Sequence, residues 1–350
     1  MEFLKKSSKY FMDTYCQLPV VLVKGKGVTL YDSEGKSYID FASGVGVNSL
    51  GYGDEKWINA VKEQIENIAH TSNIFYNAPS LKLAEKLVKE SKMSKIFFAN
   101  SGAEANEGAI KLARKYSFDK YGKNRSTIIT LKQSFHGRTL TTLSATGQEK
   151  YHNYFFPFTE GFKYAEANNY ESFLEVLDSG VCAVMMEAIQ GEGGVNPLDE
   201  DFVIKLINKC KENDILIIFD EVQCGIGRTG LLFGFNHFNI EPDIVTVAKG
   251  LASGLPIGAV LCNEKLSKVL KVGDHGCTFG GNPIASSAAL VVLEKICDEK
   301  FLQSISCKEK IIKDFFKKNP CSYIKEVRGK GLMIGIEING DSSAVQKKAL

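Results

Sequence analysis

Lys249 is the residue whose position most strongly suggests chemistry. It ends an apolar run at 244–248 and is followed at once by the Gly/Ser-containing turn 250–254. A lysine delivered by a hydrophobic strand cannot easily spread its charge into water. Such surroundings lower the amine pKa and allow the amine to form a Schiff base with a carbonyl compound. A single lysine at a strand end is more often a snorkelling side chain, so the other polar residues must decide between these interpretations.

Two carboxylates stand at the ends of apolar runs. Asp220 closes 215–219 (ILIIF), and Glu187 closes 181–186 (VCAVMM) shortly before the sequence QGEGG. Burying a carboxylate is costly unless a cation or a hydrogen-bond donor meets it. Asp220 is therefore a candidate functional residue, although a turn residue that caps the next helix would give the same pattern.

Two further loops after apolar runs carry groups that bind anions. Residues 100–103 (NSGA) open a helical segment, and small residues at a helix N-terminus offer free backbone N–H groups to an anion. A plain N-cap by Ser101 explains the same residues. Residues 135–138 (FHGR) offer an aromatic face, an imidazole and a guanidinium. Arg138 is a candidate for gripping a carboxylate with two hydrogen bonds, whereas His136 alone is more typical of a structural hydrogen-bonding residue.

An alternation of strands and helices from about residue 95 to 262 must position these groups. Apolar runs predict strands at 95–100, 126–132, 181–187, 214–220, 244–249 and 257–262. Segments between them, such as 103–116 and 201–213, carry apolar residues at helical spacing. This pattern predicts a mostly parallel α/β sheet covered on both faces, with ligands beyond the carboxyl ends of its strands. The link between the last two strands is too short for a crossover helix, which predicts a hairpin with one antiparallel strand.

The two ends of the chain have a different pattern. Residues 20–40 are typical of a three-stranded meander, and a long helical stretch after about residue 285 precedes a second meander around 329–338. We expect both ends to combine into a small α+β domain. The predicted division is 1–45 and 285–350 for the small domain and 46–284 for the large, ligand-binding domain.

Composition narrows the class of protein. The formal charge of +2, from 43 basic and 41 acidic residues, gives no bulk attraction to nucleic acid or an anionic membrane. No apolar run approaches the length of a membrane span, and residues 1–6 lack the apolar region of a secretory signal. Nine scattered cysteines without a C-x-x-C pair fit a reducing cytoplasm better than a disulfide framework or a metal site.

One motif points toward a different chemistry. Residues 225–230 (GIGRTG) satisfy the G-x-G-x-x-G pattern of dinucleotide-binding proteins. That pattern requires the first glycine directly after a strand, a helix that opens within the motif, and an acidic residue about 20 positions later. Four residues intervene after Asp220, and 231–235 (LLFGF) does not indicate a helix. A nicotinamide oxidoreductase is therefore a remote alternative.

Taken in order along the chain, the motifs strongly resemble those of the class III aminotransferases, which use pyridoxal 5'-phosphate (PLP). The motifs are 100–106 (NSGAEAN), 134–139 (SFHGRT), 187–194 (EAIQGEGG), 220–223 (DEVQ), 248–258 (AKGLASGLPIG) and 275–283 (HGCTFGGNP). The resemblance runs from about residue 10 to the end and is greatest to the acetylornithine type, through 41–51, 134–139 and 223–230. It implies the fold type I of PLP enzymes, with a mostly parallel seven-stranded sheet in the large domain.

The resemblance also implies roles for matching positions. Lys249 would hold PLP as a Schiff base and then shuttle a proton, and Asp220 would pair with the pyridinium nitrogen. The other implied cofactor contacts are backbone N–H groups of Gly102 and Ala103 and Thr278 of a neighbouring subunit for the phosphate, Phe135 and Val222 around the ring, and Gln223 at the phenolic oxygen. The implied substrate contacts are Arg138 at a carboxylate, Cys277 near the same substrate, and Glu187 and Glu192 around the entrance.

Three departures from the family pattern bear on specificity. Ornithine aminotransferases place a tyrosine at the position of Val45, so the smaller residue favours an N-acylated donor over free ornithine. Cys277 stands where the family usually has serine, which weakens the hydrogen bond expected there. The family normally continues beyond Leu350 with an arginine-containing segment, so we expect a C-terminal part to be missing.

These observations predict an aminotransferase of arginine biosynthesis. It would pass the terminal amine of N2-acetyl-L-ornithine to 2-oxoglutarate, giving the semialdehyde and glutamate, as a cytoplasmic homodimer. The alternatives are an ornithine, succinylornithine or 4-aminobutyrate aminotransferase, or a truncated homologue with impaired catalysis.

Overall fold

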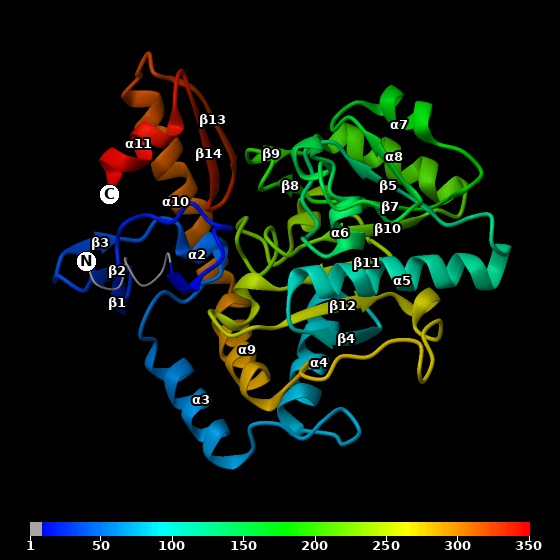
Figure 1. Cartoon of the computed structure of the whole chain (residues 1–350), viewed down its shortest axis with the longest axis horizontal. Coiled ribbons are helices and arrows are strands. Elements are labelled where there is room, and N and C mark those ends of the chain that lie inside the picture. Colours follow the sequence, from blue (N-terminus) through cyan, green and yellow to red (C-terminus); the bar gives the residue numbers. More distant parts are fainter. Residues whose placement is uncertain (1–8) are drawn as a thin grey trace.

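A seven-stranded sheet forms the centre of the protein (Figure 1). The computed structural model describes residues 9–350, so the prediction about a secretory signal in residues 1–6 lies outside the described residues. The strand order is β4-β12-β11-β10-β7-β5-β6. The strands are β4 (Lys95–Ala99), β5 (Thr127–Leu131), β6 (Phe162–Ala165), β7 (Val181–Met186), β10 (Leu216–Asp220), β11 (Ile244–Val247) and β12 (Gly258–Cys262).

The predicted α/β sheet is confirmed, including its hairpin. β12 pairs antiparallel with both of its neighbours, β11 and β4, while β10 pairs parallel with β7 and β11. β6 was not located from the sequence because its four residues are mostly half-buried at the sheet edge and form no apolar run. Edge strands pack on fewer neighbours, so their hydrophobic signal is weak.

Helices cover both faces of this sheet. The helix α5 (Gly102–Tyr121) packs on one face, and α4 (Ala78–Ser91), α8 (Glu200–Glu212) and α9 (Pro283–Ile296) cover the other. Side chains alternate along β10: Leu216 and Ile218 join the core beside α5, whereas Ile217 and Phe219 join the opposite core. The uninterrupted apolar runs in the sequence follow from this burial on both sides.

The remaining elements surround the sheet. The predicted N-terminal meander is present, and the long helical stretch predicted after about residue 285 consists of two helices, α9 and α10 (Glu299–Lys318). They are separate because Asp298 caps α10 by accepting from the backbone N–H of Phe301 at 3.0 Å. These elements are β1 (Leu22–Lys26), β2 (Thr29–Asp32), β3 (Ser37–Ile39), α2 (Ser43–Gly46), α3 (Glu55–Asn67), α6 (Leu140–Ala145), α7 (Tyr170–Val176), β8 (Ile189–Gln190), β9 (Asn196–Pro197), α10 (Glu299–Lys318), β13 (Ile324–Lys330), β14 (Met333–Ile338) and α11 (Ser342–Ala349).

The N-terminal and C-terminal parts of the described chain meet in space. Lys36 Nζ, in the turn before β3, donates to the backbone oxygen of Leu350 at 2.8 Å. The sheet β1–β2–β3 and α11 line one cavity and lie beside each other in Figure 1. The domain boundaries predicted at residues 45 and 285 stay a prediction. No helix within residues 9–350 is long and apolar enough to cross a membrane.

The GIGRTG loop is a packing surface for the hairpin β13–β14. No helix opens within it, which removes the sequence argument for a nicotinamide site. The backbone N–H of Leu332 donates to the backbone oxygen of Arg228 at 2.9 Å. A Cβ atom on Gly331 would stand 2.4 Å from the backbone carbon of Thr229, and one on Gly227 would stand 2.6 Å from Ile296 Cγ2. The glycines allow this close approach of backbone and side chain.

Replacing Gly331 by alanine should weaken this docking more than an equally strained substitution elsewhere. Gly331 and Gly27 share a φ of +59°, but nothing lies within 4 Å of a Cβ atom on Gly27. We expect Gly27→Ala to cost about 1–2 kcal/mol through backbone strain alone, and Gly331→Ala to cost about 1–3 kcal/mol more through overlap. Urea-unfolding curves of the two variants measure the difference, and equal losses would contradict the docking role of the loop.

Candidate active site

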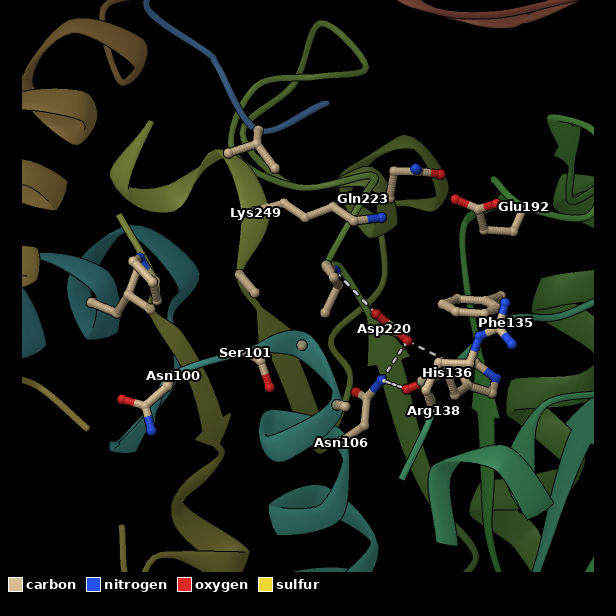
Figure 2. Close-up of a pocket in the computed structure, with 18 of the residues that line it drawn as sticks. Asn100, Ser101, Asn106, Phe135, His136, Arg138, Glu192, Asp220, Gln223 and Lys249 are labelled. Carbon is tan, nitrogen blue, oxygen red and sulfur yellow. Dashed lines mark hydrogen bonds and ion pairs between the residues drawn. The ribbon is translucent and has the colours of Figure 1, made fainter. Parts of the chain in front are cut away.

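A cavity of about 440 Å³ opens beyond the carboxyl ends of the parallel strands, where the α/β pattern predicts a ligand site (Figure 2). Its chemically useful side chains come from loops that follow five different strands. These side chains belong to Asn100 and Ser101 after β4, His136 and Arg138 after β5, Glu187 and Glu192 after β7, Asp220 and Gln223 at and after β10, and Lys249 after β11; Asn106 of α5 also lines the cavity.

Lys249 enters the cavity from a strained turn. The residue has a φ of +43° and begins the 3-10 helix Lys249–Ala252 directly after β11 and Ala248. Residues other than glycine rarely adopt a left-handed backbone conformation. Such backbone strain is typical of functional sites that the surrounding core holds in place. Leu251 and Ala252, the next residues of the turn, are fully buried and anchor it. Figure 2 shows the Lys249 side chain extending toward Gln223.

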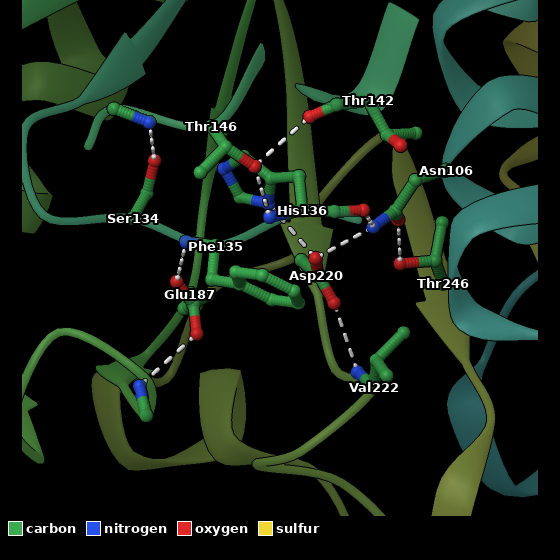
Figure 3. Close-up of polar contacts among 12 residues, drawn as sticks. Asn106, Ser134, Phe135, His136, Thr142, Thr146, Glu187, Asp220, Val222 and Thr246 are labelled. Carbon is green, nitrogen blue, oxygen red and sulfur yellow. Dashed lines mark hydrogen bonds and ion pairs between the residues drawn. The ribbon is translucent and has the colours of Figure 1, made fainter. Parts of the chain in front are cut away.

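Asp220 is buried and fully hydrogen-bonded (Figure 3). Its Oδ1 accepts from the backbone N–H of Val222 at 3.0 Å. Its Oδ2 accepts from Asn106 Nδ2 at 2.7 Å and from His136 Nδ1 at 2.8 Å. Asn106 also donates to the backbone oxygen of His136 at 2.8 Å and accepts from Thr246 Oγ1 at 2.7 Å. These donors offset the cost of burying the carboxylate.

His136 has the structural role that its sequence context favoured. Asp220 Oδ2 already accepts a hydrogen bond from Asn106 and therefore acts as an acceptor. His136 Nδ1, which contacts the same oxygen, is accordingly the donor of the second hydrogen bond. Its Nε2 is buried without a partner in residues 9–350. The backbone N–H of His136 donates to Thr146 Oγ1 at 2.9 Å. One hydrogen bond therefore orients the imidazole, and a second fixes the backbone of the same residue.

The N-terminus of α5 presents backbone N–H groups to the cavity. Ser101 Oγ accepts from the backbone N–H of Glu104 at 3.1 Å, so the N-cap predicted from the sequence is present. The first N–H groups of this 20-residue helix, at Gly102 and Ala103, have no acceptor within the helix and border the cavity. A Cβ atom on Gly102 would lie 2.6 Å from Val222 Cγ1, so the position requires glycine.

Glu187 braces two loops of the site. Its Oε1 accepts from the backbone N–H of Phe135 at 2.9 Å, and its Oε2 accepts from the backbone N–H of Gly191 at 3.1 Å (Figure 3). Burial raises the pKa of this carboxyl well above its usual range. The imidazole of His136 offsets part of the rise in pKa, and the charge of Asp220 adds to it. Both oxygens are occupied, so the predicted contact between Glu187 and substrate stays a prediction.

Most of the predicted site residues lie together. Gly102, Ala103, Phe135, Arg138, Glu187, Glu192, Asp220, Val222, Gln223 and Lys249 all line the cavity. Cys277 and Thr278 do not; Cys277 Sγ lies 3.0 Å from Asn100 Nδ2, and Thr278 is exposed in the following loop. The role of Thr278 in a neighbouring subunit stays a prediction. Within residues 9–350, no group of three or more His, Cys, Asp or Glu side chains could hold a metal ion.

Sequence reasoning missed three residues of the site. Asn106 and Thr246 support Asp220, and Val47 rather than Val45 lines the cavity. Asn106 lies four residues after Gly102 and on the same face of α5 as buried Ala109. A polar residue on the apolar face of a predicted helix is a signal that could have identified it.

Comparison with known proteins assigns the chain to a family. Residues 10–350 match the family described as Aminotransferase class-III. The chain is 49% identical, over 98% of its length and 88% of the relative's, to the acetylornithine aminotransferase of Caldanaerobacter subterraneus subsp. tengcongensis. The chain belongs to the class-III aminotransferases.

Solved structures of other aminotransferases have the same fold. The ornithine aminotransferase from Toxoplasma gondii superposes with a TM-score of 0.93 at 33% identity, covering 97% of this chain and 81% of that one. N-acetylornithine aminotransferase from Stenotrophomonas maltophilia gives a TM-score of 0.82 at 37% identity, covering 97% and 84%. The predicted family and fold class of this aminotransferase are therefore confirmed.

The buried Glu221 should make stability fall as pH rises. Its carboxylate accepts from the backbone N–H groups of Gly234 and Phe235 at 2.6 and 2.8 Å. Burial raises its pKa from 4.5 to about 7, these donors offset part of the rise, and Asp220 adds to it. The unfolded chain releases this proton near pH 4.5, whereas the folded protein keeps it until about pH 7. The stabilisation is thus complete below the lower pKa and lost above the higher one.

The substitution Glu221→Gln removes the titrating carboxyl, so the difference in stability between the wild type and this variant reports the titration of Glu221. We expect the free energy of unfolding of the wild type, relative to Glu221→Gln, to decrease between about pH 5 and about pH 7 and then to level off. Urea unfolding of both proteins across this range measures the difference. Parallel curves at every pH would contradict the raised pKa.

Proposed function

We propose that this aminotransferase transfers the terminal amino group of N2-acetyl-L-ornithine to 2-oxoglutarate, giving N-acetyl-glutamate semialdehyde and glutamate. The observation that carries the proposal is the placement of Lys249 and the buried Asp220 in one cavity with the N-terminus of a long helix. An amine, a carboxylate and an anion site are the groups that PLP requires of a protein. PLP is accordingly the cofactor of the proposed reaction.

The residues around the cavity fit PLP. The N–H groups of Gly102 and Ala103 would bind the phosphate, and Asp220 would pair with the ring nitrogen. Figure 3 shows Phe135 and Val222 on either side of the Asp220 carboxylate, where they would enclose the ring. Gln223 would contact the phenolic oxygen. When bound, PLP supplies an electron sink and carries the amino group between the two substrates.

The side chains of the protein move protons and hold substrates. Lys249 Nζ would take the proton from the substrate carbon that bears the transferred nitrogen, and would return one in the second half of the reaction. Asp220 Oδ1 and Oδ2 accept from three donors, and the carboxylate would keep a proton on the ring nitrogen. Arg138 would bind a substrate carboxylate, with Glu192 near the entrance.

Sequence identity supports an acylated donor. The chain shares 49% of its residues with an acetylornithine aminotransferase and 33% with an ornithine aminotransferase. The second candidate function is ornithine transamination, which the TM-score of 0.93 to the Toxoplasma gondii ornithine aminotransferase favours. Overall fold discriminates donors less well than the residues of the site do, so N2-acetylornithine, and with it a role in arginine biosynthesis, is the primary proposal.

A homodimer completes the proposed site. Thr278 lies in a loop that Asn73 ties to the segment 68–76 through a 2.8 Å hydrogen bond from its Nδ2 to the backbone oxygen of Cys277. This segment and the loop expose a group of large apolar side chains: Ile68, Ile74, Phe75, Tyr76 and Phe279. An apolar surface of this kind is typical of an interface between subunits. Thr278 would reach the phosphate of the partner's cofactor.

The cysteines fit a cytoplasmic location, because all of them within residues 9–350 are free.

Lys249→Ala should abolish turnover. Loss of the proton-transfer amine is expected to lower kcat by about 100- to 10,000-fold, and borohydride should no longer fix the cofactor covalently to the protein. Lys132→Ala is the matched control, since Lys132 also follows a strand but pairs with Glu166 at 2.6 Å outside the cavity. Steady-state kinetics and mass spectrometry after borohydride treatment measure both effects. Undiminished turnover of Lys249→Ala, or an inactive wild type that takes up PLP, would contradict the proposal.

Donor preference separates the candidate reactions. With 2-oxoglutarate as the common acceptor, we expect kcat/KM for N2-acetylornithine to exceed that for ornithine, N2-succinylornithine or 4-aminobutyrate by about tenfold or more, because transition-state contacts to the acyl group distinguish the donors. Side-by-side initial rates give the ratios. A higher value for ornithine would assign the second candidate function instead.

A further inference from the structure

Tyr151 lies under the guanidinium of Arg138. The Arg138 Cζ atom is 4.1 Å from the centroid of the Tyr151 ring and 5.6 Å from that of the Phe135 ring. The two rings meet edge to face, with centroids 6.1 Å apart and an interplanar angle of 73°. Arg138 forms no ion pair within residues 9–350. The aromatic faces are therefore what orients its charge before a substrate arrives.

The segment that carries Tyr151 is fixed to the loop that carries Arg138. The backbone N–H of Gln133 donates to the backbone oxygen of Gly147 at 2.7 Å, and the N–H of Gly147 donates to Ser134 Oγ at 3.0 Å. Gln148, which is buried, donates from Nε2 to the backbone oxygen of Ser134 at 3.0 Å. These contacts hold the short 3-10 helix Glu149–Tyr151 against the loop, so the ring is preorganised.

We propose that Tyr151 is a positioning residue that presents Arg138 to the carboxylates of both the amino donor and the oxo acid. This inference rests on the proposed function, in which Arg138 binds those carboxylates. A flexible arginine at an exposed position loses side-chain entropy when it binds, and stacking on a fixed ring reduces that loss. Tyr151 thus determines affinity for carboxylate substrates without touching them.

The contact requires the ring and not the hydroxyl. The Tyr151 hydroxyl has no hydrogen-bond partner within residues 9–350, whereas its ring contacts Arg138, Phe135 and the exposed Lys150, whose Nζ lies 4.8 Å from the centroid. Tyr151→Phe keeps the ring and should behave as the wild type. Tyr151→Leu keeps an apolar side chain but removes the cation–π contact, so it isolates the proposed interaction.

Binding of glutarate, an unreactive dicarboxylate, to the PLP-loaded enzyme tests the proposal by calorimetry. We expect Tyr151→Leu to raise the Kd for glutarate by about 3- to 30-fold, the range of a cation–π contact that is desolvated on binding. Tyr151→Phe should change it less than about twofold. KM for N2-acetylornithine and 2-oxoglutarate should rise with the Kd, while kcat/KM for N-acetylputrescine, a donor without a carboxylate, and the absorbance of bound PLP should stay unchanged.

Control variants separate failure of this inference from failure of the proposed function. Tyr154→Leu changes an exposed aromatic near Tyr151 in sequence that contacts no cation in the described part of the chain, and this variant should bind glutarate as the wild type does. If Arg138→Ala raises the Kd but Tyr151→Leu does not, the positioning role is wrong and the role of Arg138 stands. If Arg138→Ala leaves glutarate binding unchanged, the proposed role of Arg138 fails. An increase in Kd for Lys150→Gln as large as that for Tyr151→Leu would assign the anion contact to Lys150 and overturn the inference.

Discussion

The burial of the Asp220 carboxylate is the constraint on which the site depends. A buried carboxylate without donors would destabilise the fold by several kcal/mol, so each donor must arrive in register. Asn106 comes from α5, His136 from the loop after β5, and Thr246 supports Asn106 from β11. One carboxylate thereby fixes the relative positions of a helix, a loop and two strands. The same elements form walls of the candidate active site.

A strained turn and a rigid core complement each other around Lys249. The left-handed backbone of Lys249 is unfavourable by itself. However, the preceding strand β11 is fully buried between its parallel neighbour β10 and its antiparallel neighbour β12, and Leu251 packs into the core. A packed core resists small displacements, so it holds the turn in this conformation. The fold therefore aims the amine at the cavity, since the Lys249 side chain makes no hydrogen bond to any of residues 9–350.

The glycine-rich loop at 225–230 shows why a motif needs its structural context. Its letters satisfy a dinucleotide fingerprint, but Gly227 allows close packing against α9, and Gly331 of the hairpin β13–β14 allows the hairpin to pack on the loop. The N-terminus of α5, with a less distinctive sequence, borders the cavity and is the anion site of the proposed function. A free helix N-terminus, rather than the count of glycines, provides the N–H groups that bind a phosphate.

The sequence by itself determined the strands β4, β5, β7, β10, β11 and β12, the hairpin and the position of most cavity residues. Burial on both faces of a sheet leaves continuous apolar runs, and the polar residues that end such runs all reach the same edge. Tertiary structure alone decided the partners of those residues. Asn106 and Thr246 are 140 positions apart, and Tyr151 meets Arg138 only because Gly147 and Gln148 fold back on the loop. Local patterns record which face a residue occupies, whereas hydrogen bonds and ring contacts depend on how distant segments pack.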